Sequence, residues 1–144
     1  RYDEHHLSGV LAPLEAPDAG ADAIREAFAG YAAASHGWAR GRGCLLCNTA
    51  VERAALDPAA RRHVDAYLDR LTRAFRHALT NARSAGDLDP AVDLDELASF
   101  FTMALVGVAA VIRAEAAPEL VEAACLVATS VLDCHTNPTS VSAD

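Results

Sequence analysis

The chain has 144 residues, a formal net charge of −8 and 52% hydrophobic residues, which excludes a disordered or fibrous polymer and suits one folded domain. All 12 basic residues are arginine, against 20 Asp and Glu. Because a surface that follows nucleic-acid phosphates needs clustered positive charge, this chain alone is not expected to bind nucleic acid. The polar opening segment is no signal peptide, so we expect a cytoplasmic protein, and the opening reads as part of a longer chain.

The pattern of apolar residues is helical almost throughout, and the 33 alanines beside 8 glycines and 6 prolines favour helices. A first helix is expected from the start of the chain to about Leu14. A second helix is expected to begin with Asp18 as its cap and to close at Gly37. A third helix is expected over residues 44–56.

The second half of the chain has clearer start and stop signals. Asp57 followed by Pro58 predicts the start of a long fourth helix, which a glycine cap at Gly86 ends. Asp93 with Glu96 three residues later resembles a capping box and predicts the start of the fifth helix. A sixth helix is expected from about residue 118 to 132.

The fourth helix has a charged side that we expect to face solvent. Its arginines recur every three residues and are expected to pair with aspartates one turn away on the same helix. The residues concerned are Arg70, Arg73 and Arg76 with Asp65 and Asp69.

The last two helices are apolar on all sides. Residues 97–112 include only Ser99 and Thr102 as polar side chains, and residues 120–132 have a single charge, Glu122. A helix that is apolar all round must be buried on every side. The 16-residue apolar run between the charges at 96 and 113 falls short of the roughly 20 residues that cross a bilayer.

Four amphipathic helices in a chain this small cannot cover two such helices, so we expect an obligate twofold dimer with a four-helix interface. A central helix tightly wrapped within a monomer is the alternative. The residues expected at the dimer interface are Ala104, Val108, Val111, Ala124, Val127, Ala128 and Val131.

Three segments carry motifs whose order and spacing are informative. Residues 43–52 read GCLLCNTAVE, residues 86–98 read GDLDPAVDLDELA, and residues 105–107 read LVG. They resemble the GCLLxNTAxE segment, the G-x-L…D…LA segment and the L-x-G of the C-terminal regulatory domain of TetR/AcrR-family transcriptional regulators. Residues 2–15 resemble the helix that leaves the DNA-binding head of these proteins. The resemblance implies an all-α six-helix bundle whose last two helices dimerise.

The same resemblance implies a division of labour. An N-terminal helix-turn-helix reads DNA, and the C-terminal helices form a homodimer and bind a small effector, which releases the repressor from its operator. No helix-turn-helix lies in this sequence, so operator DNA is expected to bind only through an N-terminal domain outside it. Residues 1–134 are expected to form the effector-binding and dimerisation domain, and residues 135–144 a frayed tail.

In the family, the effector cavity lies inside the bundle, between the first and fifth helices of this domain. An apolar cavity with a few polar groups suits a small hydrophobic or aromatic effector. Asn48 stands among apolar neighbours and needs a polar partner. For each residue, ordinary core packing is the alternative. The residues expected to line the cavity are Phe28, Tyr31, Trp38, Cys47, Asn48, Val51, Tyr67, Leu71, Phe100, Phe101 and Met103.

Cys44 and Cys47 form a CxxC pattern at the start of the expected third helix. A helix N-terminus favours a thiolate, so a redox sensor is the leading alternative function, against buried inert thiols. A CxxC oxidoreductase is weaker, because alkylhydroperoxidase-like proteins have a histidine where Val51 stands. No other group of residues indicates catalysis, and we expect no enzyme activity, no metal and no cofactor.

Overall fold

The computed structural model describes residues 2–37 and 57–136, and these residues form five α-helices with no strand among them. The predicted all-α class is confirmed, and the expected third helix over residues 44–56 lies outside the described residues. The helices are α1 (Tyr2–Glu15), α2 (Ala21–Ala34), α4 (Pro58–Ser84), α5 (Leu94–Arg113) and α6 (Pro118–Cys134).

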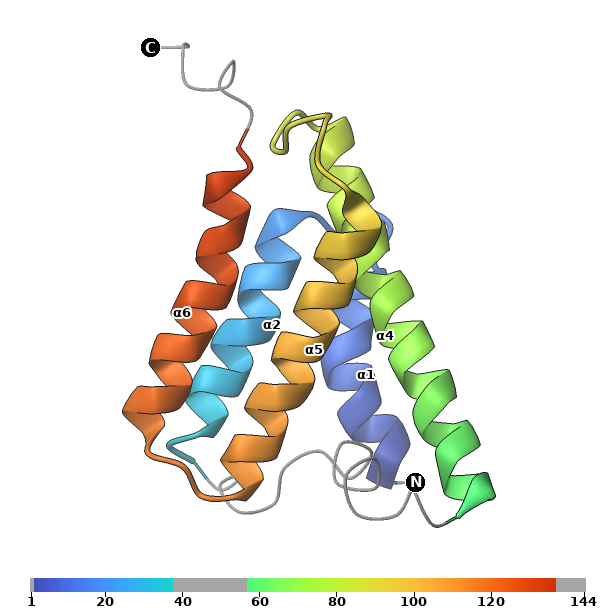
Figure 1. Cartoon of the computed structure of the whole chain (residues 1–144), viewed down its shortest axis with the longest axis vertical. Helices are drawn as coiled ribbons and strands as arrows, with labels where there is room; N and C mark the ends of the chain where they lie inside the picture. The colour runs from blue at the N-terminus through green and yellow to red at the C-terminus, as the bar shows by residue number, and fades with distance from the viewer. Residues whose placement is uncertain (1, 38–56, 137–144) are drawn as a thin grey trace.

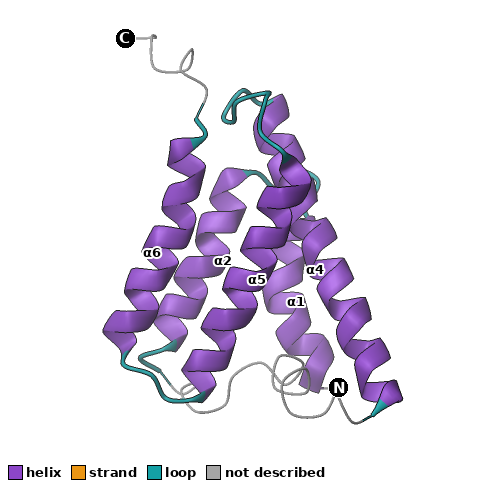
Figure 2. Cartoon of the chain, viewed as in Figure 1, coloured by secondary structure: helices purple, strands orange, loops and turns teal. Residues whose placement is uncertain are grey.

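Successive described helices alternate in direction along one bundle axis, and the described turns between α1 and α2, α4 and α5, and α5 and α6 lie at its two ends (Figures 1 and 2). In Figure 1, α5 lies between α6 on one side and α4 on the other, with α2 and α1 behind them. The turn between α4 and α5 lies at the same end as the last turn of α6, and the Asp89 amide donates to the His135 carbonyl there at 2.8 Å. His135, the first residue of the expected frayed tail, is therefore attached to the bundle.

The predicted signals at both ends of α4 and at the start of α5 are confirmed. Asp57 caps α4, because its side chain accepts a hydrogen bond from the Ala59 amide at 2.8 Å, and Pro58 opens the helix. Gly86 follows the end of α4 with a φ of +87°, a conformation that favours glycine. Asp93 caps α5 by accepting from the amides of residues 95 and 96 at 2.9 and 3.1 Å.

Asp18 does not cap α2, contrary to the prediction. The helix begins at Ala21 with Gly20 as its N-cap and no side-chain capping bond. The chain is still turning before that point, where the Ala19 amide donates to the Ala16 carbonyl at 3.0 Å. At the other end, α2 stops at Ala34, before the predicted Gly37.

Helix α5 is longer than its apolar run, because its first turn includes two acidic residues. At 20 residues it is the one described helix that could cross a bilayer by length and composition. Instead it packs against α2, α4 and α6. Its inner side chains join the hydrophobic core, with Phe101 and Leu105 almost fully buried.

Candidate functional site

The centre of the bundle is filled by three phenylalanine rings from three helices. Phe28 of α2, Phe75 of α4 and Phe101 of α5 are fully buried, and their ring centroids lie 5.7 to 6.4 Å apart. Such spacing is typical of packed aromatic side chains. Phe28 and Phe101 were predicted to line an effector cavity, and their contacts in this cluster are those of a packed core.

The other inward-facing residues of the predicted cavity also belong to this core. Leu71 is fully buried, Tyr67 is 7% exposed, and Tyr31 packs against the same cluster while partly exposed. Tyr31 lies in the last turn of α2, and Tyr67 lies in the first half of α4.

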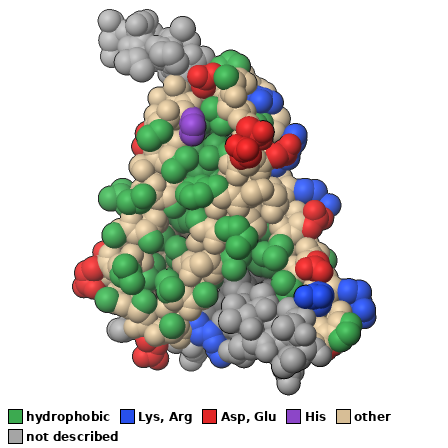
Figure 3. All heavy atoms as spheres, in the orientation of Figure 1, with side chains coloured by type: hydrophobic (Ala, Val, Ile, Leu, Met, Phe, Trp, Pro, Cys, Tyr) green, Lys and Arg blue, Asp and Glu red, His purple; other side chains and the backbone are tan. Residues whose placement is uncertain are grey.

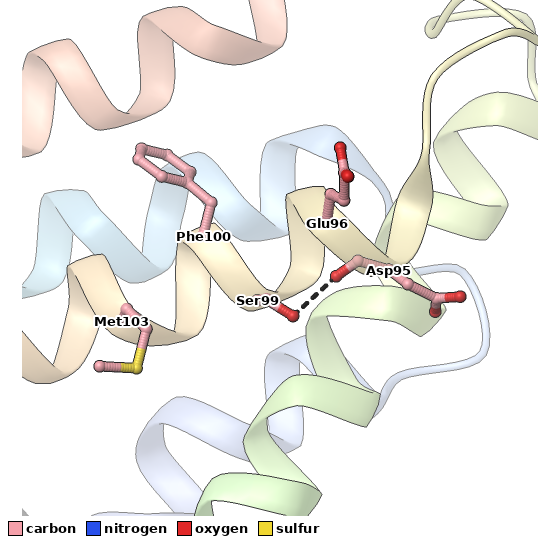
Figure 4. Close-up of a pocket in the computed structure, with 5 residues that line it drawn as sticks. All are labelled: Asp95, Glu96, Ser99, Phe100 and Met103. Atoms are coloured by element: carbon pink, nitrogen blue, oxygen red, sulfur yellow. Dashed lines mark hydrogen bonds between the residues drawn. The ribbon is translucent and has the colours of Figure 1, made fainter.

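Phe100 and Met103 lie on the opposite side of α5, which corrects the prediction that they line an internal cavity. Their side chains are 42% and 64% exposed. A turn of 100° per residue places them away from Phe101, which points into the core. With the three polar residues of the preceding turn, they line an open surface pocket of about 570 Å³ (Figure 4). The polar residues are Asp95, Glu96 and Ser99.

The remaining predicted cavity residues are Trp38, Cys47, Asn48 and Val51, and they lie outside the described residues. The same holds for Cys44, so the CxxC hypothesis stays a prediction. Cys125 of α6 is buried in the core, and burial raises the pKa of its thiol, which keeps it protonated at neutral pH. Within the described ranges, no group of three or more His, Cys, Asp or Glu residues is placed to hold a metal ion.

A second pocket, of about 430 Å³, lies at the end of the bundle where α2 begins and α4 and α6 finish. The guanidinium of Arg25 bonds to Asp22 at 3.1 Å and to Asp133 of α6 at 2.8 Å. Sequence reasoning missed this pocket, because it is formed by segments far apart in the chain. Its lining residues are Asp18, Gly20, Ala21, Asp22, Arg25, Asn81, Ala82, Ala85, Asp87, Leu88, Leu132 and Thr136.

Polar side chains of α4 hold the connection between α1 and α2. The Asn81 amide donates to the carbonyls of Pro17 and Ala19 at 3.1 and 2.8 Å. His77 Nε2 lies 2.9 Å from the Ala16 carbonyl oxygen. Because backbone carbonyls in a turn need donors, these contacts fix the path of the chain between the two helices.

A two-pronged ion pair joins α4 to the end of α1. Arg70 donates from Nε and Nη2 to the two carboxylate oxygens of Glu15, each at 2.7 Å. These bonds lower the pKa of Glu15 below its ordinary value, with the charge of Arg70 adding to the effect and partial burial opposing it.

One side of α5 and α6 is apolar and largely exposed, with Ala104 and Val131 half-buried against the core. Its residues follow a four-three-four spacing on each helix, which places each set in one row. Figure 3 shows hydrophobic side chains gathered over these two helices. We call these two rows the outer face: Phe100, Ala104, Gly107 and Val111 on α5, with Leu120, Ala124, Val127 and Val131 on α6.

Five of the seven predicted interface residues lie on the outer face, and two do not. Val108 and Ala128 are only 5% and 6% exposed, because they point into the protomer's own core, so they present little surface to a partner. Phe100 and Leu120 were missing from that prediction although they are 42% and 61% exposed. The same four-three-four spacing in the sequence could have identified both.

Comparisons with known proteins agree with this fold. Residues 20–128 match the family described as tetracyclin repressor-like, C-terminal domain. Over 133 residues the chain is 28% identical to YezE, an uncharacterized HTH-type transcriptional regulator of Bacillus subtilis (strain 168), across 92% of this chain and 69% of that protein. No solved structure matches the chain. Because the family match spans most of the sequence, the chain belongs to the C-terminal regulatory domains of TetR-family transcriptional regulators.

Proposed function

We propose that this domain is the homodimerising, effector-binding half of a TetR-family repressor that acts in the cytoplasm and leaves its operator when a small apolar or aromatic effector binds. The observation that carries the proposal is the outer face. Four of its large apolar side chains are 38% to 66% exposed in the protomer, namely Phe100, Val111, Leu120 and Val127. Exposed apolar patches of this kind typically mark interaction surfaces.

A second copy of the chain fits the outer face for electrostatic reasons. The chain carries a net charge of −8, so two copies repel each other over most of their surfaces. None of the eight residues of the outer face is charged. Two copies related by a twofold axis therefore meet there without bringing like charges into contact, and they bury the same apolar rows on both sides.

Sedimentation equilibrium of a matched pair of variants tests the dimer. Wild type should be a dimer at micromolar concentration, and Val127→Glu should raise its dissociation constant at least about 100-fold, because it buries two carboxylates in an apolar contact. Leu126→Glu is the control, since Leu126 is 72% exposed but lies on the other side of α6, near Glu122. A monomeric wild type, or equal effects of both variants, would contradict the proposal.

The effector site is proposed away from the three phenylalanine rings, at the end of the bundle near Tyr31 and Tyr67. In the sequence, residues 38–56 lie between α2, which carries Tyr31, and α4, which carries Tyr67. This segment includes Trp38 and Asn48. Aromatic and amide side chains of this kind suit an aromatic ligand with one or two polar groups.

A thermal-shift screen with small aromatic compounds tests the effector site, because a ligand that binds only the folded state raises the unfolding temperature. Asn48→Ala and Tyr67→Phe should each reduce the shift that a bound compound produces. Leu126→Ala, on the exposed polar side of α6, should leave it unchanged. Equal shifts in wild type and in both site variants would show that these residues do not contact the effector.

The acidic surface indicates that another part of the regulator contacts DNA. In the proposed mechanism, α1 connects the bundle to that part. The Arg70–Glu15 pair and the Asn81 contacts attach the end of α1 and the turn after it to α4. A shift of α4 on effector binding would therefore move α1 with it.

A further inference from the structure

The outer face of α5 contains a glycine in the middle of a helix. Gly107 lies in a 20-residue helix that runs from Leu94 to Arg113. Glycine in a helix interior is destabilising relative to alanine, because its backbone loses more conformational freedom on folding. Gly30 inside α2 carries the same cost, so the place of Gly107 on the surface, and not the glycine alone, is what matters.

No described residue of the protomer accounts for the glycine at this position. Gly107 does not have the positive φ that Gly86 has, so its backbone would accept any residue except proline. A Cβ atom added to Gly107 would meet no atom within 4 Å, so neighbouring elements of the protomer do not exclude a side chain.

Gly107 lies at the centre of the exposed apolar row on α5. The larger side chains of Phe100 and Val111 stand on either side of it along the row, and Ala104 lies one turn away. The backbone of α5 is therefore bare at one place, between larger side chains, on a face without charges. The distance between packed helices depends on the side chains at their contact, and small residues permit the closest approach.

We propose that Gly107 is the point at which a helix of a second copy of this chain approaches α5 most closely, so that the dimer requires the absence of a side chain there. This inference rests on the proposed dimer. It adds that dimerisation depends on the close fit of the two copies at this one position, in addition to the apolar area that they bury. The second copy is the occupant because the surface is uncharged on an otherwise acidic chain.

A matched pair of glycine substitutions tests the inference. Gly107→Ala should raise the dimer dissociation constant about tenfold or more, because a methyl group inserted at a close contact forces the helices apart. Gly30→Ala is the control: Gly30 lies inside α2, is exposed, meets no atom within 4 Å of an added Cβ and lies off the outer face. It should leave the dissociation constant unchanged and raise the unfolding temperature, as alanine does in a helix.

Gly107→Leu extends the same test. It should give a monomer at micromolar concentration with the wild-type helical circular dichroism, since Gly107 is exposed and an added Cβ meets no described atom within 4 Å. If wild type dimerises and Gly107→Ala has the dissociation constant of Gly30→Ala, the inference is overturned while the proposed dimer stands. If wild type itself is monomeric, the proposed dimer is overturned, and the inference with it.

Discussion

The inner core and the outer face have nearly the same composition but opposite environments. Phe101 and Phe100 are neighbours whose ring centroids lie 5.3 Å apart, yet Phe101 is fully buried and Phe100 is 42% exposed. The inner side of α5 is covered by α2 and α4, and no described helix covers its outer side to the same extent.

This difference explains why α5 is apolar all round. One side packs inside the protomer, where a pair of hydroxyls, Thr72 and Thr102, lies 3.0 Å apart between α4 and α5. The other side has the same hydrophobic character, and the described residues cover it less completely. Hydrophobicity on all sides of a helix in a small domain therefore indicates two packing partners, of which only one needs to belong to the same protomer.

The largest expected effect comes from truncating the two neighbouring phenylalanines. Phe101→Ala removes a ring from the three-ring cluster and should lower the free energy of unfolding by about 3–5 kcal/mol. Phe100→Ala should change the stability of the protomer by less than about 1 kcal/mol, because its ring is already partly hydrated, but it should weaken the dimer. Urea unfolding over a range of protein concentrations separates protomer stability from dimerisation, and sedimentation equilibrium measures the dimer dissociation constant directly.

The comparison fails if the two variants behave alike. Equal losses of stability would mean that Phe100 packs as tightly as Phe101 within the protomer. An unchanged dissociation constant for Phe100→Ala would remove its ring from the proposed interface. The concentration must be varied because dimerisation itself stabilises the folded state, and only the dimer's share of the stability depends on concentration.

Local signals in the sequence were sufficient for the bounds of the helices in the second half of the chain. A cap and the helix that it begins lie within four residues, so Asp57, Gly86 and Asp93 could be identified without tertiary information. Asp18 gave the same kind of signal, but the cap predicted there is wrong. The turn after α1 continues past it, held by α4 through Asn81, which is 62 residues away from Ala19.

The inner and outer sides of α5 and α6 were harder to predict, because a helix that is apolar all round gives no direction to its core. This is why Phe100 and Met103 were expected inside, and Val108 and Ala128 at an interface, whereas in the protomer the first two are exposed and the second two are buried. The row spacing was in the sequence, but choosing which row faces inward required the positions of α2 and α4.

The ion pairs of α4 could also be predicted only in part from the sequence. Arg73 pairs with Asp69 one turn away at 2.8 Å, as the spacing predicted. Arg70 and Arg76 were expected to make similar pairs, but they bond to Glu15 of α1 and to Asp95 of α5 instead. Neither partner could be predicted from helical spacing, since both lie on other helices.

The smallest expected effect on stability comes from the ion pair between Arg70 of α4 and Glu15 of α1. Glu15→Gln should lower the free energy of unfolding at neutral pH by at most about 1 kcal/mol, because both partners are at least one-third exposed and solvent screens the pair. Asp69→Asn is the control: its pair with Arg73 is more exposed, and the loss should be about 0.3–0.5 kcal/mol.

The stability that the pair between Glu15 and Arg70 contributes should depend on pH, and the lowered pKa of Glu15 sets the direction of that dependence. Arg70 lowers the pKa of Glu15 in the folded state below the ordinary value of 4.5. The unfolded chain therefore binds this proton more readily, and the pair contributes its full stability above that value. As the pH falls through the lowered pKa, the carboxylate is protonated in the folded state too, and the contribution disappears. Urea unfolding should thus show a difference between wild type and Glu15→Gln at neutral pH that shrinks in acid. A difference that persisted there would have to come from packing of the side chain, and α1 would then be held to α4 much as the inner core is held together.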